Sequence, residues 1–219
     1  MGMFMILLVV IVLGGCQLGD SNKNQKPSEM DTEDLPDVRA FDDEFTRDFL
    51  QSTKEVREGY YPFLSGTEKY QTDFPASGVL GEKSYYKRDD TYEELAIHIK
   101  EPNSSIIRIN YFQDDSLDLL KDNLDAFKTR IGYEGDFEEI EKNNRTIYYA
   151  NYERSGYRTF VGYVLSQKNM GAVEITYKID YRDVEKDMKN KHKESDQERA
   201  LKWIESVEFS DGEEGENHE

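Results

Sequence analysis

The chain has 219 residues, of which 28 are basic and 46 acidic, and its formal net charge is −18. Nucleic acid is excluded as a partner, because counterion release at phosphates needs clustered Lys and Arg side chains and the sequence has no such cluster. The single cysteine excludes an internal disulfide, so the fold depends on its core alone.

The chain begins with an unbroken apolar segment, Met3 to Leu13, without a charged side chain. As a helix, residues 3–15 would be about 20 Å long at ~1.5 Å per residue. That is too short for the ~30 Å hydrocarbon core of a bilayer. Its length, and the small residues that follow it, are typical of a signal peptide. The sequence therefore predicts an export signal over residues 1–15.

Leu13-Gly14-Gly15-Cys16 closes this segment and resembles the lipobox of bacterial lipoproteins. The resemblance implies that the Cys16 thiol receives a diacylglyceryl group, that the peptide is cut before it, and that Cys16 becomes the mature N-terminus. No Lys or Arg precedes the apolar run, which departs from the pattern and leaves room for a start codon upstream. Cys16 is the predicted lipidation site, and a buried or free thiol is the alternative.

Two polar segments are expected to flank one folded domain. Residues 16–40 continue from Cys16 as a polar stretch with two prolines and no apolar period, so we expect a flexible tether. Residues 211–219 carry five acids and two glycines and are expected to form a disordered acidic tail. A single domain is predicted over residues 41–210, where abundant Tyr and Phe argue against disorder.

The first half of this domain is expected to combine a helix with short strands. Residues 59–78 are interrupted by proline and glycine and predict one or two short strands. Residues 94–100 and 106–112 alternate clearly and predict two strands joined by a turn at 101–103. The helix is predicted before them, from apolar residues that share one helical face: Phe41, Phe45, Phe49 and Val56.

The period then changes and predicts the clearest helix of the chain. Asp115 or Ser116 is expected to cap its start, and Gly132 is expected to end it. Its apolar stripe consists of Leu117, Leu120, Leu124, Phe127 and Ile131.

Three strands are predicted next, at residues 146–152, 159–165 and 172–179, with connections short enough for hairpins. The last of them alternates apolar and polar residues, so we expect one of its faces to meet water. A closing helix is predicted from a cap at Ser195, followed by a short strand at Phe209. Its inward residues are expected to be Ala200, Trp203, Ile204 and Val207.

This order of elements predicts an α+β domain in which an antiparallel β-sheet packs against helices. The order, which ends in ALKWIESVEF, resembles the fold shared by the Mog1 and PsbP proteins over about residues 59–209. The segment FPASGVLGEKSYYKRDDTYEELAIHI resembles uncharacterised lipoproteins from Bacillus and its relatives. The resemblance implies a two-layer domain, and it carries over no catalytic or ligand residue.

Residue patterns for catalysis or metal binding are scarce. The sequence has no GxSxG, no HExxH and no phosphate-binding glycine loop, and His98 is expected at the surface of its strand. Paired carboxylates could act as acid and base or bind Ca²⁺, but Asp also favours caps and turns. The pairs are Asp42-Asp43, Asp89-Asp90 and Asp114-Asp115. We predict no catalytic residue, no metal site and no cofactor.

The tyrosines of the strand at 146–152 give the strongest hint of recognition. Tyr148, Ala150 and Tyr152 share one strand face, and Tyr149 shares the other with Ile147. A water-facing aromatic row could bind a glycan, a peptide or a protein. Cross-strand packing is the simpler account.

The leading hypothesis is a non-enzymatic lipoprotein, anchored by its lipid at the outer face of the cytoplasmic membrane. Its domain would bind an envelope protein or glycan, or assist an envelope process. One alternative is an envelope hydrolase, which two carboxylates converging in a pocket with a perturbed pKa would favour. Another is a passive cation-binding or spacer lipoprotein, which a Ca²⁺ titration would detect.

Overall fold

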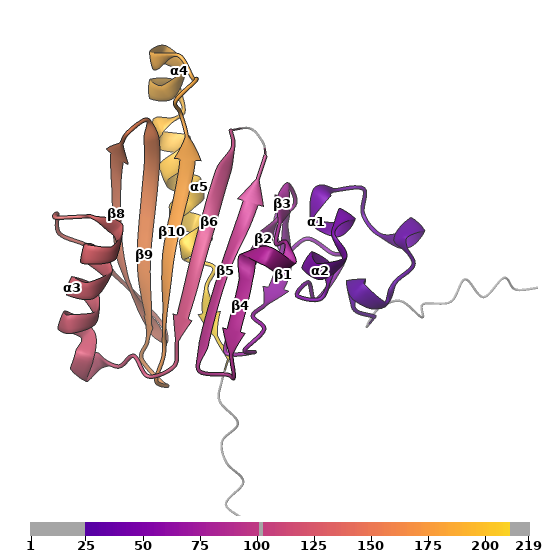
Figure 1. Cartoon of the computed structure of the whole chain (residues 1–219), viewed down its shortest axis with the longest axis horizontal. Helices are drawn as coiled ribbons and strands as arrows, with labels where there is room; N and C mark the ends of the chain where they lie inside the picture. Colours follow the sequence, from indigo (N-terminus) through magenta and orange to yellow (C-terminus); the bar gives the residue numbers. More distant parts are fainter. Residues whose placement is uncertain (1–24, 101–102, 211–219) are drawn as a thin grey trace, which may run out of the picture.

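The structure is a computed structural model that describes residues 25–100 and 103–210; the predicted signal segment, Cys16 and the acidic tail lie outside the described residues. An eight-stranded antiparallel sheet forms its body (Figure 1). Seven strands follow the order β3-β5-β6-β10-β9-β8-β7, and β4 also pairs with β5. A second sheet has the order β1-β2-β11. The α+β class predicted from the sequence is confirmed.

The elements have the following bounds. The strands are β1 (Tyr60–Leu64), β2 (Tyr70–Pro75), β3 (Gly78–Val79), β4 (Tyr85–Arg88), β5 (Tyr92–Ile99), β6 (Ser105–Phe112), β7 (Glu138–Lys142), β8 (Arg145–Arg154), β9 (Tyr157–Ser166), β10 (Ala172–Asp180) and β11 (Glu208–Phe209). The α-helices are α1 (Arg39–Asp42), α2 (Glu44–Arg47), α3 (Leu120–Ile131), α4 (Lys186–Lys191) and α5 (Lys193–Ile204). Single 3₁₀ turns are η1 (Pro27–Glu29), η2 (Thr32–Asp34), η3 (Glu82–Ser84) and η4 (Leu117–Leu119).

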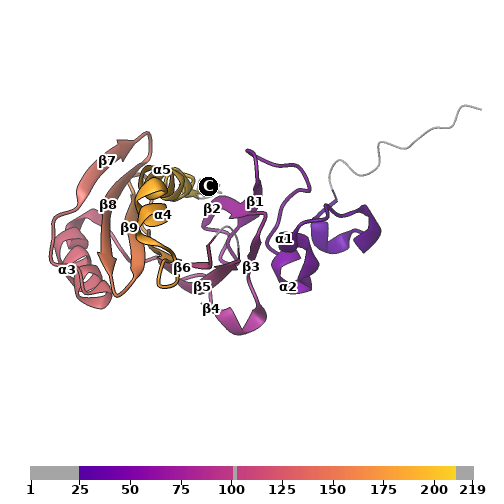
Figure 2. The same cartoon turned by 90° about the horizontal axis from the view of Figure 1, so that it is seen from above.

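The inner face of the large sheet carries the main core. Alternate residues of β5, β6, β9 and β10 point to this face, and α5 and the small sheet cover it (Figure 2). Trp203 of α5 is fully buried, and its indole N–H donates to the Asp73 carbonyl oxygen of β2. The inward positions predicted for the closing helix, Ala200, Ile204 and Val207 among them, are confirmed.

α3 lies on the opposite, outer face of the large sheet. Phe127 is only 2% exposed and its ring centre lies 6.2 Å from that of Tyr163 on β9. Gly132 ends the helix in the left-handed conformation, at φ 65°, as predicted. Leu117 does not belong to the buried stripe, because it lies in η4 and is 59% exposed. Neither predicted cap at the start is confirmed, since no side-chain cap bond forms at Ser116 and Asp115 binds elsewhere.

The helix predicted over residues 41–56 is wrong. Asp43 has extended backbone angles and its carboxylate accepts the Thr46 N–H at 2.8 Å, so the chain forms two separate single turns, α1 and α2. Leu50 then forms a bridge to β1. Phe41 and Phe49 still reach the core, from different segments.

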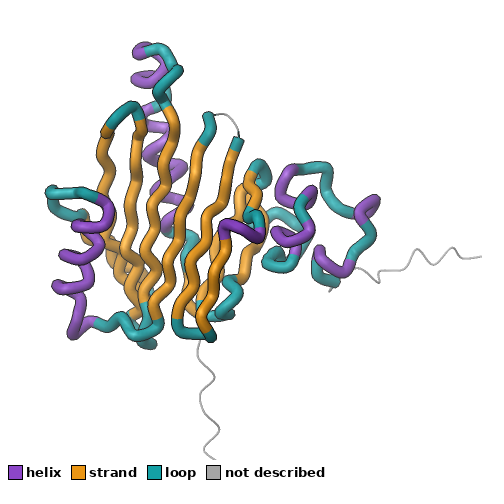
Figure 3. Tube along the Cα trace, viewed as in Figure 1, coloured by secondary structure: helices purple, strands orange, loops and turns teal. Residues whose placement is uncertain are grey.

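The tether predicted to extend to Ala40 ends earlier. Leu35 and Val38 pack against the core, and Ala40 is fully buried with its N–H donating to the Ala76 carbonyl oxygen at 2.9 Å. The helical turns of residues 27–47 gather beside the edge of the sheet that contains β3 (Figure 3). The folded domain therefore begins before Phe41.

Other differences concern elements rich in charge. The sequence did not predict β4, β7 or α4, because YYKR, EEIEK and KDMKNK lack an apolar period. Ser195 is not a cap: α5 begins at Lys193, and the Ser195 hydroxyl donates to the His192 carbonyl oxygen inside the first turn. Among residues 25–100 and 103–210, no helix is long and apolar enough to cross a membrane.

Candidate binding face

The outer face of the large sheet has two halves. α3 covers the half formed by β8, β9 and the adjoining end of β10, whereas no α-helix of the described chain lies over β5 and β6 (Figure 1). We call the uncovered half the open face. The register of the strands assigns to it Tyr86, Arg88, Tyr92, Glu94, Ala96, His98, Ile106, Arg108, Asn110, Phe112, Thr176 and Lys178.

Three aromatic side chains form a row across one end of the open face. Tyr92 pairs directly with Phe112, and their ring centres lie 5.2 Å apart. The Tyr86 ring lies 6.1 Å from the Tyr92 ring and is 55% exposed. Burial and the neighbouring Glu94 carboxylate raise the pKa of Tyr92 to about 12, so its hydroxyl stays protonated and donates to Glu94 at 3.2 Å.

Basic side chains surround this row. The Arg88 guanidinium lies 5.9 Å from the centre of the Tyr92 ring, and that of Arg130 lies 5.9 Å from the centre of the Phe112 ring. Within the described part of the chain, neither Arg108 nor Lys178 has an ion-pair partner. The open face thus carries three basic residues against one acidic residue, on a chain whose net charge is −18.

A hollow of about 270 Å³ lies beside the aromatic row. Strand β4 and η3 form one wall, and outward residues of β5 and β6 form its floor. His98 is exposed, as the sequence predicts, and its Nε2 lies 3.3 Å from the Ser84 hydroxyl. The polar side chains around the hollow are Lys83, Ser84, Tyr86, Glu94, His98 and Arg108.

On the covered half, acidic side chains are paired with neighbouring donors. Glu174 was expected to meet water but is 2% exposed, because α3 lies above it and Arg130 donates to its carboxylate. Burial raises the pKa of Glu174, and Arg130 opposes that rise. Burial also raises the pKa of Asp115, whose carboxylate accepts the Tyr163 hydroxyl at 2.7 Å. Two carboxylates with raised pKa therefore lie in this half: Glu174 is buried under α3, and Asp115 is partly exposed in the loop before η4.

The aromatic row that the sequence pointed to is on this covered half. Tyr148 is 8% exposed, and the Tyr152 hydroxyl donates to the Ile131 carbonyl oxygen at the end of α3. These side chains pack and do not face water, which supports the simpler account of cross-strand packing. Tyr149 lies on the inner face with Ile147, as predicted.

A buried acid lies on the inner face of β5, directly behind the open face. Glu93 is fully buried and accepts the Gly66 N–H at 2.7 Å, while the Lys87 amine donates to the Gly66 carbonyl oxygen at 2.8 Å. Burial raises the pKa of Glu93. Burial and the nearby Glu93 carboxylate raise the pKa of Tyr85 as well. The group fixes the β1–β2 turn to the large sheet.

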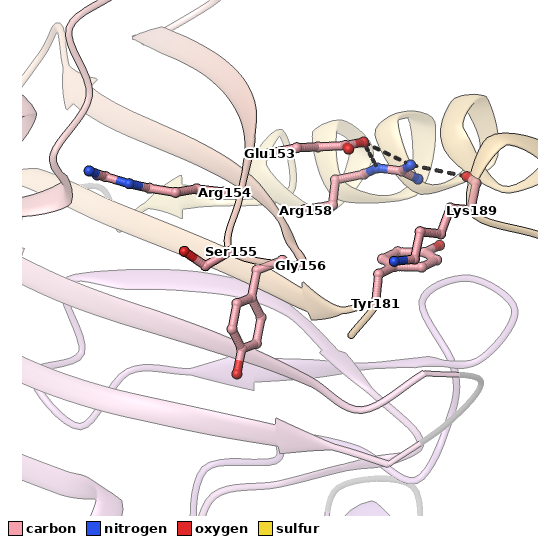
Figure 4. Close-up of a pocket in the computed structure, with 8 residues that line it drawn as sticks. Glu153, Arg154, Ser155, Gly156, Arg158, Tyr181 and Lys189 are labelled. Atoms are coloured by element: carbon pink, nitrogen blue, oxygen red, sulfur yellow. Dashed lines mark hydrogen bonds and ion pairs between the residues drawn. The ribbon is translucent and has the colours of Figure 1, made fainter. Parts of the chain in front are cut away.

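A second hollow, of about 170 Å³, lies between the β8–β9 turn and α4 (Figure 4). Arg158 dominates it, but its donors are already used by the carboxylates of Glu153 and Asp196 and by the Lys189 carbonyl oxygen. Asp196, on α5, also accepts from Arg199 at 2.6 Å. This network fastens α4 and α5 to the sheet, and Arg158 serves it through all three of its nitrogen atoms.

Two of the three acidic pairs lie near one another, at one end of the large sheet, where the Gln113 N–H donates to the Thr91 carbonyl oxygen at 2.9 Å. Burial raises the pKa of Tyr111 to about 12, and Asp114 and Asp90 add to that rise. Asp43 caps α2, Asp89 adopts a positive φ of 48° in the β4–β5 turn, and Asp114 is exposed beyond β6. Among residues 25–100 and 103–210, no group of three or more His, Cys, Asp or Glu side chains could hold a metal ion. The residues that do gather, on the open face, were missed by the sequence reasoning. The strand predicted at 106–112 already placed Phe112 on the side opposite Ile107 and Ile109. Tyr92 lies before the strand predicted at 94–100, and Tyr86 lies in a strand that was not predicted.

The family model and the curated relative that match this chain carry the same description. A family model described as "Putative lipoprotein YvcA" matches residues 36–208. A protein of that description from Bacillus subtilis (strain 168) is 28% identical over 156 residues, which cover 65% of this chain and 65% of the relative's length. Among solved structures, a mutant of the protein Mog1 gives a TM-score of 0.45 at 8% identity, over 69% of this chain and 96% of that one. A protein from Bacteroides thetaiotaomicron VPI-5482 gives 0.39 at 11% identity, over 71% and 50%.

Proposed function

We propose that this chain, which belongs to the family of the lipoprotein YvcA, is a lipid-anchored, non-enzymatic domain that binds another envelope protein through its open face. Membership of a lipoprotein family agrees with a membrane-anchored, extracytoplasmic protein. The segment that ends in Cys16 supplies the attachment point for the lipid. We assign membrane attachment to this lipid and not to electrostatic binding, because anionic headgroups repel an acidic chain.

The open face is the observation that carries the proposal. Tyr and Arg are enriched at the centre of protein interfaces and dominate their binding energy. Here Tyr86, Tyr92 and Phe112 lie in one row, with Arg88 and Arg108 beside them. Tyr86 is exposed and Tyr92 and Phe112 are half-buried, so a partner that covers the row buries further apolar area.

The buried acids support a non-enzymatic role. Asp115 and Glu174 are carboxylates with raised pKa, as the acidic site of a hydrolase needs, but Tyr163 already donates to Asp115 and Arg130 of α3 to Glu174. To reach Glu174, a substrate would have to displace α3, whose Phe127 is buried. The hydrolase alternative therefore has the weaker support.

Site-specific photo-crosslinking of the full-length lipoprotein in its own cells tests the binding face. Tyr86 is replaced by p-benzoylphenylalanine, and Lys121, whose side chain on α3 is 86% exposed, is replaced in a matched control. We expect a discrete protein adduct from position 86 and none from position 121. Equal adducts from both positions, or none from position 86, would contradict the proposal.

The anchor has its own test. Cys16→Ser removes the thiol that takes the lipid, so we expect an uncleaved precursor that partitions differently in detergent. A variant that is still processed at residue 16 and stays in the membrane fraction like the wild type would show that the lipobox interpretation is wrong.

A further inference from the structure

The charge of the open face is opposite to the charge of the chain. Arg108 is exposed at the middle of β6, and Lys178 lies diagonally from it on β10, because Thr176 pairs with Arg108 and Lys178 with Ile106. Diagonal neighbours of this kind lie about 7–8 Å apart. Neither cation has an ion-pair partner among the described residues. Two adjacent uncompensated cations on an acidic protein point to an anionic ligand.

The hollow beside Arg108 is lined by hydrogen-bond donors. Lys83, Ser84 and His98 line it together with Arg108, and Glu94 is its single acidic side chain. The Glu94 carboxylate already accepts the Tyr92 hydroxyl. A volume of about 270 Å³ is roughly nine times the ~30 Å³ share of one water in the liquid, enough for a carboxylate side chain.

The main chains of β5 and β6, which form the floor of the hollow, are not available for recognition. β5 is paired on both sides, by β6 and by β3 and β4, and β6 lies between β5 and β10. A partner cannot add a strand to β5 or β6, so over the hollow and at Arg108 side chains must recognise it. Arg108 can bind a carboxylate with two parallel hydrogen bonds, while Tyr86 and Tyr92 offer apolar area next to it.

We infer that the open face recognises an acidic segment of its protein partner, with one carboxylate seated between Lys83, His98 and Arg108 and apolar neighbours packed on Tyr86 and Tyr92. The inference rests on the proposed function and names the kind of partner. A short acidic segment interacts only with the cations of the open face. An extended anionic surface such as a bilayer also lies close to the acidic remainder of the protein, which repels it.

The test uses the full-length lipoprotein in detergent and a fluorescein-labelled peptide of alternating Glu and Leu, with a peptide of alternating Gln and Leu as its control. Arg108→Glu is compared with Lys121→Glu, which makes the same change of charge on α3. We expect saturable binding of the Glu peptide alone, weakened about tenfold or more by Arg108→Glu and less than about twofold by Lys121→Glu.

Three results would overturn the inference: no saturable binding, equal binding of the Gln peptide, or equal weakening by both variants. Vesicles containing phosphatidylglycerol form another arm, and Arg108-dependent binding of vesicles in place of the peptide would also overturn it. If the Glu peptide does not bind while position 86 still cross-links a protein, the open face is a binding surface whose partner is held by apolar contacts. The two proposals can therefore fail separately.

Discussion

The covered and open halves of the outer face belong to one sheet and share only strand β10, and their side chains differ in exposure. Under α3, Tyr148 and Tyr163 are buried and Glu174 is paired. On the open face, Tyr86 is exposed and Arg108 has no ion-pair partner in the described chain. Alternation along a strand determines which residues share a face. Whether that face is covered depends on a helix elsewhere in the chain.

The largest expected difference between the halves is in packing. Phe127→Ala removes a buried ring from beneath α3 and leaves a cavity, so we expect it to lower the free energy of unfolding by about 3–5 kcal/mol. Phe112→Ala on the half-buried end of the open face should cost about 1 kcal/mol or less. Urea melts measure both. Equal shifts would show that the open face is as tightly packed as the covered half.

A smaller effect is expected from the ion pair at the boundary of the halves. Arg130→Met leaves the Glu174 carboxylate buried without its cation, which should cost about 1–2 kcal/mol at neutral pH, less than a fully buried pair because Arg130 is half-exposed. Without Arg130 the pKa of Glu174 rises further, so the folded variant binds a proton more readily. The cost should therefore fade as the pH is lowered toward the ordinary value of 4.5. Melts at pH 7.5 and pH 4.5 measure this, and a loss independent of pH would contradict the account.

Replacing the buried acid behind the open face, Glu93, should raise the stability of the protein at high pH, whereas Arg130→Met lowers it. The pKa of Glu93 is raised in the fold by burial, so ionising it costs stability as the pH rises above the ordinary 4.5. Glu93→Gln keeps an acceptor for the Gly66 N–H and removes this cost. We expect a gain of roughly 1 kcal/mol at pH 8 and none at pH 4.

Glu94→Gln, on the exposed side of the same strand, is the matched control for this substitution and should change stability by less than about 0.5 kcal/mol. If Glu93→Gln destabilises the protein at pH 8, the charged carboxylate holds the β1–β2 turn more strongly than its burial costs.

Much of the sheet could be predicted from the sequence, because β5, β6 and β10 carry apolar residues at alternate positions and β8 and β9 contain apolar runs that are buried on both faces. The α3 helix and its end at Gly132 followed from the 3.6-residue period. The two single turns at Asp43 could not be predicted, since Phe41, Phe45 and Phe49 fit a helical period while reaching the core from separate segments. The open face was missed for a different reason. Its residues are ordinary outward positions of strands, and only the placement of α3 over β8 and β9 leaves them uncovered.

The smallest change in stability is expected for substitution of Tyr86, the residue that we expect to contribute most to binding. Tyr86→Ala removes a side chain that is more than half exposed, so its free energy of unfolding should fall by about 0.5 kcal/mol or less. A urea midpoint that moves as far as that of Phe127→Ala would mean that Tyr86 is part of the core, and the contrast between the halves would then be wrong.

The central claim, that the open face is a binding surface, is tested most directly by the yield of protein adduct from p-benzoylphenylalanine at position 86 in cells, measured with Arg108 intact and with Arg108→Glu. We expect a discrete adduct that is lost in the Arg108→Glu chain, although that chain is as stable as the wild type in urea. An adduct of unchanged yield would refute the charge recognition, and the absence of any adduct from position 86 would contradict the binding face itself.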